Sequence, residues 1–83
     1  MKIKISTVAG NVDLNGYSCS SWEEVEDTMR GFGAGVYIGQ QMMKGLKPEP
    51  GQNGLLNSWV DEDTGAKYYN FGQHVFKARE IKN

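Results

Sequence analysis

The sequence predicts an α+β fold, in which an antiparallel β-sheet carries one long or kinked helix packed across one face. Three observations lead to it: strand-like alternation near both ends of the chain, a strong helix start after residue 20, and a Pro/Gly-rich loop that returns the chain to the sheet. The expected order of elements is ββ-α-βββ. With 83 residues, the chain has room for a single α+β domain, 1–83.

The N-terminal segment predicts a β-hairpin. Ile3 and Ile5 alternate with lysine and serine, which is the period of a half-buried strand. Residues 9–11 suit a turn, because glycine and asparagine tolerate a positive φ. We expect a second strand over 12–19, with Asn15-Gly16 marking a bulge or a second turn.

A helix is expected to begin near Ser21. Two overlapping capping boxes, Ser20 with Glu23 and Ser21 with Glu24, precede it, and carboxylates over 23–27 suit the positive end of the helix dipole. At 100° per residue, six apolar side chains fall on one narrow stripe that should face the sheet. These are Trp22, Val25, Met29, Phe32, Val36 and Met43.

The glycine-rich segment 31–39 leaves two interpretations open. Each glycine inside a helix costs about 0.5–1 kcal/mol relative to alanine, which favours a break between two short helices. Gly31, Gly35 and Gly39, however, recur every four residues and would form a smooth seam on one helix running to about Gly45. A strand or loop could then cross the helix closely along that seam.

The second half of the chain predicts a return to the sheet. Residues 47–54 are rich in proline and glycine and form a loop. Strand-like segments follow, separated by an acidic turn at 62–65 and a short turn at 72–73. The three strands are expected at 56–61, 66–71 and 74–81.

The sequence offers no constellation of catalytic groups, so we expect a protein that is not an enzyme and holds no cofactor or metal. Cys19 and His74 are the only cysteine and histidine, and their spacing gives no reason to pair them as nucleophile and base. One of each cannot build a Cys/His zinc site. The carboxylates at 23–27 and 61–63 are explained by helix capping and by a turn.

We expect a cytoplasmic location and no membrane partner. The longest apolar stretch is far short of the ~20 residues that a membrane span needs, and the alternating N-terminus lacks the apolar core of a secretory signal. A lone cysteine fits a reducing compartment. For a phage-encoded protein this compartment would be the host cytoplasm.

Aromatic residues point to a protein-binding surface. Five of the nine aromatics lie between Trp59 and Phe76. Tyr68 and Tyr69 are adjacent in a strand and point to opposite faces, so one of them faces away from the helix, although the sequence leaves open which. Tyr, Trp and Met are enriched at protein interfaces. The candidate protein-binding residues are Tyr37, Ile38, Trp59, Tyr68 and Tyr69.

These observations predict a small protein-binding domain that docks onto a larger protein as an inhibitor, adaptor or accessory subunit. A homodimer is a further option. Compact, cysteine-poor domains without catalytic groups are common among phage-encoded modulators of host enzymes or defence systems, so a viral protein of this kind is one interpretation.

Two alternatives remain. A sheet with an outward tyrosine and a basic stripe could bind single-stranded nucleic acid. The net charge of −1 does not favour binding to a polyanion. The stripe would consist of Lys2, Lys4, Lys77, Arg79 and Lys82. The glycine-rich helix could instead bind a small ligand, although no Gly-Lys-Ser/Thr follows as in a phosphate loop.

Overall fold

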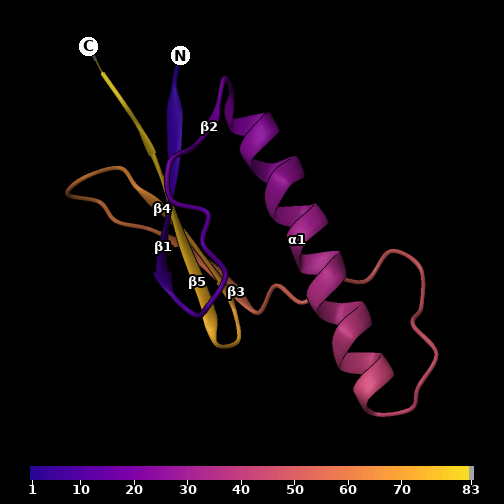
Figure 1. Ribbon diagram of the computed structural model, residues 1–83. Helices are drawn as coiled ribbons and strands as arrows, with labels where there is room; N and C mark the ends of the chain where they lie inside the picture. Colours follow the sequence, from indigo (N-terminus) through magenta and orange to yellow (C-terminus); the bar gives the residue numbers. More distant parts are fainter. Residues whose placement is uncertain (83) are drawn as a thin grey trace.

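The computed structural model describes residues 1–82 and places one helix against one face of a five-stranded antiparallel sheet (Figure 1). This arrangement confirms the predicted fold class and the ββ-α-βββ order. The strands lie side by side in the order β2-β1-β5-β4-β3. The elements are β1 (Ile3–Ala9), β2 (Tyr17–Cys19), α1 (Trp22–Met43), β3 (Asn57–Val60), β4 (Lys67–Phe71) and β5 (His74–Glu80).

The N-terminal hairpin forms, but its second strand is shorter than expected. Residues 10–16 are a loop rather than a strand, and the Thr7 side chain bonds to two of the backbone groups in this loop. Its Oγ1 donates to the Val12 carbonyl at 2.9 Å and accepts from the Leu14 amide at 2.8 Å. Val12 and Leu14 still pack against the core from this loop.

Helix α1 begins where the sequence predicts and is continuous through the glycine-rich segment. Ser21 is the N-cap, and its Oγ accepts from the Glu24 amide at 3.1 Å. The helix ends in a Schellman motif. Gly45 takes a φ of 71°, and the Leu46 amide donates to the Gln41 carbonyl at 2.9 Å. The interpretation with a single helix is therefore confirmed.

The close approach to the helix occurs at Gly33, not along the seam that we expected. The Gly54 amide of the returning loop donates to the Gly33 carbonyl at 2.8 Å. A Cβ on Gly33 would lie 2.8 Å from the Phe71 ring, whereas a Cβ on Gly31, Gly35 or Gly39 would meet no atom within 4 Å. The seam prediction is wrong because these three glycines lie on the side of α1 that faces away from the loop.

The core lies between the first half of α1 and the inner sheet face. Val25 and Met29 of the helix are buried against strand residues, and the Phe32 ring packs edge-on against Phe71 and Phe76 at centroid distances of 5.1 and 4.8 Å. The buried strand residues of this cluster are Ile3, Ile5, Cys19, Tyr69, Phe71, Phe76 and Ala78.

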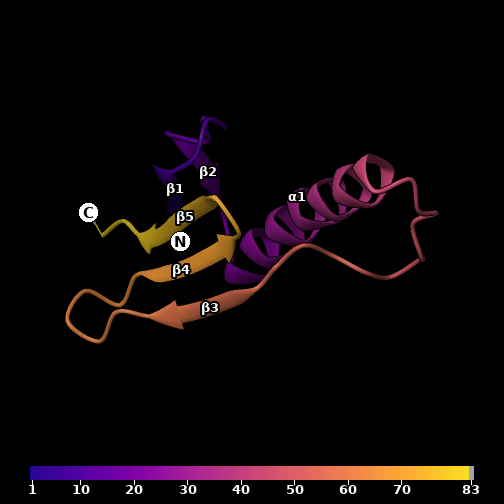
Figure 2. The same ribbon diagram turned by 90° about the horizontal axis from the view of Figure 1, so that it is seen from below.

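The second half of α1 projects beyond the sheet. The molecule is elongated, with extents of 48 × 21 × 21 Å, and Figure 2 shows the helix and its following loop extending past the strands. Met43 lies on the same stripe as Met29, yet it is 90% exposed. The prediction that Met43 faces the sheet is therefore wrong, because no strand lies beneath this part of the helix.

Candidate functional site

One sheet face is left uncovered by the helix, and it brings together five of the predicted site residues. We call this set the open face: Lys4, Trp59, Tyr68, Lys77 and Arg79. In the strand register, Lys4 lies opposite Arg79, Lys77 opposite Tyr68, and Tyr68 opposite Trp59. The Trp59 and Tyr68 rings stack in parallel with their centroids 5.3 Å apart.

The neighbouring Tyr69 belongs to the core, so it is unavailable as the contact residue that we predicted. Its side chain is 1% exposed, and its hydroxyl donates to Glu26 Oε1 at 2.7 Å. Burial, together with this bond to the Glu26 carboxylate, raises the pKa of Tyr69 well above its usual range. The sequence contained an indication of which tyrosine is buried. Along this strand Asn70 shares a face with Tyr68, whereas the apolar Phe71 shares a face with Tyr69.

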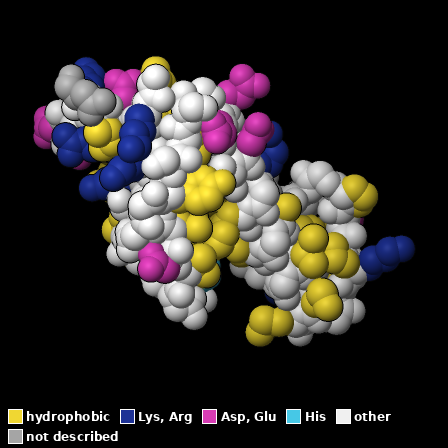
Figure 3. All heavy atoms as spheres, turned by 45° about the horizontal axis from the view of Figure 1, so that its top comes forward, with side chains coloured by type: hydrophobic (Ala, Val, Ile, Leu, Met, Phe, Trp, Pro, Cys, Tyr) yellow, Lys and Arg dark blue, Asp and Glu magenta, His cyan; other side chains and the backbone are white. Residues whose placement is uncertain are grey.

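A second surface lies on the projecting end of the helix. We call it the helix tip: Ile38, Met42, Met43 and Leu46, all exposed apolar side chains. Met42 is 68% exposed, and Figure 3 shows apolar side chains gathered over this projecting part of the molecule, at lower right. Of these four, only Ile38 was predicted from the sequence as a contact residue.

Tyr37 supports the helix tip instead of standing free on it. The residue is half-buried, and its hydroxyl accepts from the Glu49 amide at 3.2 Å. This bond ties the loop after α1 back along the helix. Tyr37 therefore holds the tip in place more than it offers a surface of its own.

The remaining predicted basic residues, Lys2 and Lys82, are exposed near the two chain ends. The ends lie together, because the Ile81 amide donates to the Lys2 carbonyl at 2.8 Å. Basic side chains gather at this end of the molecule, at upper left in Figure 3. The structure thus places Lys4, Lys77 and Arg79 on the open face, and Lys2 and Lys82 near the chain ends.

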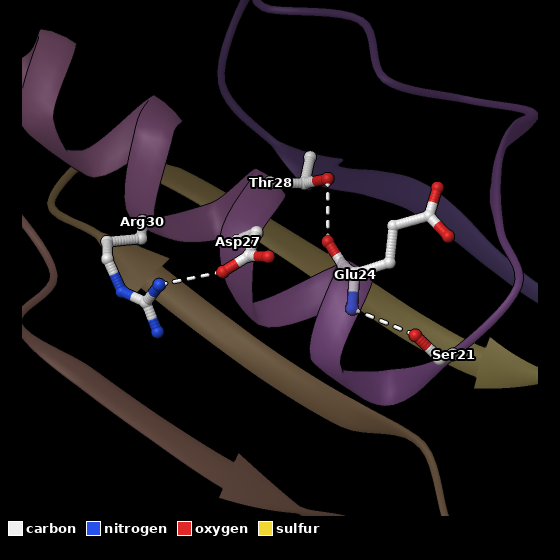
Figure 4. Close-up of polar contacts among 5 residues, drawn as sticks. All are labelled: Ser21, Glu24, Asp27, Thr28 and Arg30. Carbon is white, nitrogen blue, oxygen red and sulfur yellow. Dashed lines mark hydrogen bonds and ion pairs between the residues drawn. The ribbon is translucent and has the colours of Figure 1, made fainter.

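Acidic side chains near the start of α1 bond to residues close to them in the sequence. In Figure 4, the Ser21 hydroxyl accepts from the Glu24 amide, the Thr28 hydroxyl donates to the Glu24 carbonyl at 2.9 Å, and Asp27 pairs with Arg30 at 2.7 Å. The Glu24 carboxylate accepts from the side chain and the amide of Ser20, and these bonds lower its pKa. The Glu24 carboxylate therefore acts at the helix start, whereas Asp27 forms a surface ion pair further along the helix.

Cys19 and His74 lie far apart in the fold. Cys19 lies beside Ile3 in the sheet, whereas His74 follows the far end of β1, about 20 Å away at ~3.3 Å per residue. Burial is the largest influence on Cys19 and raises the pKa of its thiol. Within residues 1–82, no group of three or more His, Cys, Asp or Glu side chains could hold a metal ion.

A shallow hollow of about 400 Å³ lies between the glycine side of α1 and the β4–β5 turn. Gly35, Gly39 and Gly72 contribute to its lining. None of the described residues that line it is Lys, Arg, Asp or Glu, and His74 is the titratable side chain in its lining. Among residues 1–82, no helix has the length and apolarity that a membrane span requires.

Comparisons of this chain with protein-family models, with curated proteins and with solved structures found no match. Evidence for its function therefore comes from the surfaces of the chain itself.

Proposed function

We propose that this protein is a non-enzymatic binding domain that docks onto a larger protein through its helix tip, acting as an inhibitor, adaptor or accessory subunit. One observation carries the proposal: α1 continues well past the sheet and ends in exposed apolar side chains. A modulator encoded by a phage and acting in the host cytoplasm is one form of this role.

The apolar character of the helix tip supports a binding role. Apolar surface removed from water stabilises a complex by roughly 25 cal/mol per Å² before the costs of association. Ile38 and Met42 lie four residues apart on α1 and so share one helix face, which is the geometry that fits an apolar groove on a partner. Methionine side chains adapt to irregular apolar surfaces, which suits such a contact.

The helix tip is also well held, which limits the entropy lost on binding. The Schellman motif at Gly45 satisfies the last carbonyls of the helix, and the bond between Tyr37 and the Glu49 amide ties down the following loop. A surface that is already ordered binds with less conformational cost than a flexible one.

Site-specific photocrosslinking in the producing cell tests this function. A photoreactive amino acid at Ile38 should yield a crosslink to a discrete larger protein, and Met42→Lys should remove that crosslink, because it places a charge in the apolar contact. Ser18→Lys, on the exposed strand β2, is the matched control and should leave the crosslink intact. An Ile38 probe that yields no discrete product, or a product equally strong with Met42→Lys, would contradict docking through the tip.

A second candidate function is binding of single-stranded nucleic acid at the open face. It is favoured by the register, which places Lys77 opposite Tyr68 and Lys4 opposite Arg79. Bases could stack on the aromatic pair while these cations contact phosphates. Titration of labelled single-stranded DNA and RNA over a salt series tests it: Tyr68→Ala should weaken binding, and no binding at low salt would reject it.

A further inference from the structure

The outer edge of β3 is an unusually open strand edge. Within the described sheet β3 pairs only with β4, and in Figure 2 it forms the margin of the sheet. All four of its residues, Asn57–Val60, are exposed, and none is charged or proline. Natural sheets protect such edges with lysine, proline, a bulge or a very short strand. With no lysine or proline in its four residues, β3 leaves its outer backbone groups open to a strand partner.

The ladder register shows which backbone groups the edge offers. The Asp61 amide donates to the Ala66 carbonyl at 2.9 Å, which makes these two residues a hydrogen-bonded pair. Because such pairs alternate along an antiparallel ladder, Trp59 directs its backbone groups toward Tyr68 of β4. Ser58 and Val60 therefore direct their amides and carbonyls outward from the sheet.

We propose that two copies of this chain pair through β3 in antiparallel register about a two-fold axis at Trp59. The outward groups of Ser58 would then bond to those of the second copy's Val60, and the reverse, which gives four backbone hydrogen bonds across the axis. The two five-stranded sheets would become one continuous sheet with both helices on the same face.

The edge is self-complementary in its side chains. At the axis, the two Trp59 side chains would lie directly opposite each other on the open face, each already stacked on its own Tyr68. Directly opposed aromatic residues are among the more stabilising cross-strand pairs. Pairing would also cover part of Val60, which is 56% exposed, and of Leu56, which is 71% exposed.

Charge favours an antiparallel pairing of identical copies. The acidic turn of residues 61–63 follows β3 directly. In an antiparallel pair with Trp59 at the centre, each Asp61 lies opposite the second copy's Asn57, so the two acidic turns are about 13 Å apart along the strand direction at ~3.3 Å per residue. That separation exceeds the Debye length of about 8 Å at physiological ionic strength, whereas parallel strands would place the turns together.

Sedimentation over a concentration series tests the pairing. The wild-type chain should move from a mass of 9.2 kDa toward twice that mass as concentration rises. Val60→Lys should keep it monomeric at concentrations where wild type is dimeric, and Ser18→Lys on the opposite edge β2 should not. Circular dichroism confirms that each variant is folded.

Cysteine crosslinking tests the register and gives a positive signal. Residues that face each other without hydrogen bonds have Cα atoms about 4.5 Å apart, which is within disulfide range. Trp59→Cys should therefore form a disulfide-linked dimer when oxidised glutathione is supplied, whereas Ser18→Cys should not. Cys19 is buried and should not interfere.

The proposal is independent of docking through the helix tip. Met42→Lys should remove the crosslink to the larger protein but leave the dimer, and Val60→Lys should do the reverse. A wild-type chain that stays monomeric and gives no Trp59→Cys crosslink would overturn the pairing. A dimer that Met42→Lys abolishes and Val60→Lys preserves would overturn it as well, because it would place the interface at the helix tip.

Discussion

The two halves of α1 both carry apolar residues at helical spacing, but they lie in different surroundings. In the first half, Val25 and Met29 are buried against the sheet, and Phe32 packs on Phe71 and Phe76. In the second half, Val36 still packs against the core, but Ile38, Met42 and Met43 beyond it are exposed. The helical period of apolar residues continues through both halves, so the period alone does not distinguish a packed segment from a projecting one.

This difference separates two roles within one helix. The first half contributes to folding, because it removes apolar surface from water within the chain itself. The second half contributes little to the core and keeps its apolar surface available to a partner. Substitutions at matched positions in the two halves should therefore affect different measurements.

The largest contrast is expected between two methionines. Met29→Ala should lower the free energy of unfolding by about 2–5 kcal/mol, because it leaves a cavity beneath the helix. Met42→Ala should change it by less than about 0.5 kcal/mol, since that side chain is mostly exposed. Urea unfolding of both variants measures the contrast. Equal effects would mean that the helix tip is packed in solution.

A second contrast lies between two glycines. Gly33→Ala should destabilise the fold by about 1–3 kcal/mol, because its Cβ would lie 2.8 Å from the Phe71 ring and 3.3 Å from the Cβ of Asn53. Gly35→Ala meets no atom within 4 Å and should stabilise the helix by about 0.5–1 kcal/mol. Thermal unfolding of the pair should move in opposite directions, and a stabilising Gly33→Ala would contradict the observed approach of the loop.

The N-terminal cap should give an intermediate effect. Ser21→Ala removes the acceptor for the Glu24 amide and should cost about 1 kcal/mol. Ser20→Ala is the control: it removes the hydroxyl bond to the Glu24 carboxylate but keeps the bond from the Ser20 amide, so its effect should be smaller. If Ser20→Ala costs more than Ser21→Ala, then the helix starts one residue earlier than in the structure.

Much of the fold follows from local patterns in the sequence. The capping residues around Ser21 predicted the helix start, and strand-like segments predicted β3, β4 and β5 to within one residue at each end. These features depend on neighbouring residues, which the sequence shows directly. Most of the loop at residues 10–16 was missed, because the spacing of apolar residues does not show that the Thr7 side chain bonds to the Val12 carbonyl and the Leu14 amide.

The candidate site was harder to predict, because it depends on where the sheet ends. Met43 satisfies the same helical period as Met29, and only the position of the strands shows that it is exposed. The seam of Gly31, Gly35 and Gly39 was equally ambiguous, since spacing does not say which side of a helix the next segment will cross. The pairing of Lys4 with Arg79 required a neighbouring arrangement of β1 and β5 that the sequence only suggested.

The smallest expected effect concerns the ion pair that links the packed half of α1 to β4. Glu26 Oε1 accepts from Lys67 Nζ at 2.9 Å and from the Tyr69 hydroxyl at 2.7 Å. Desolvation opposes ionisation of Glu26, but these two hydrogen bonds and the charges of Lys67 and Arg30 together lower its pKa. Since the pair is partly exposed, its contribution to stability should be below about 1 kcal/mol.

The sign of the pH dependence follows from that lowered pKa. The contribution of Glu26 should be fully present above its ordinary pKa of 4.5 and lost as the pH falls through the lower value of the folded state. Glu26→Gln keeps an acceptor for the Tyr69 hydroxyl but has no charge to titrate, so the stability difference between wild type and variant should shrink below pH 4.5. Glu24 is present in both proteins, and its own acid titration cancels in the difference. A difference that is constant from pH 7 to pH 3 would mean that folding does not lower the pKa of Glu26, and that its charge gains nothing from Lys67.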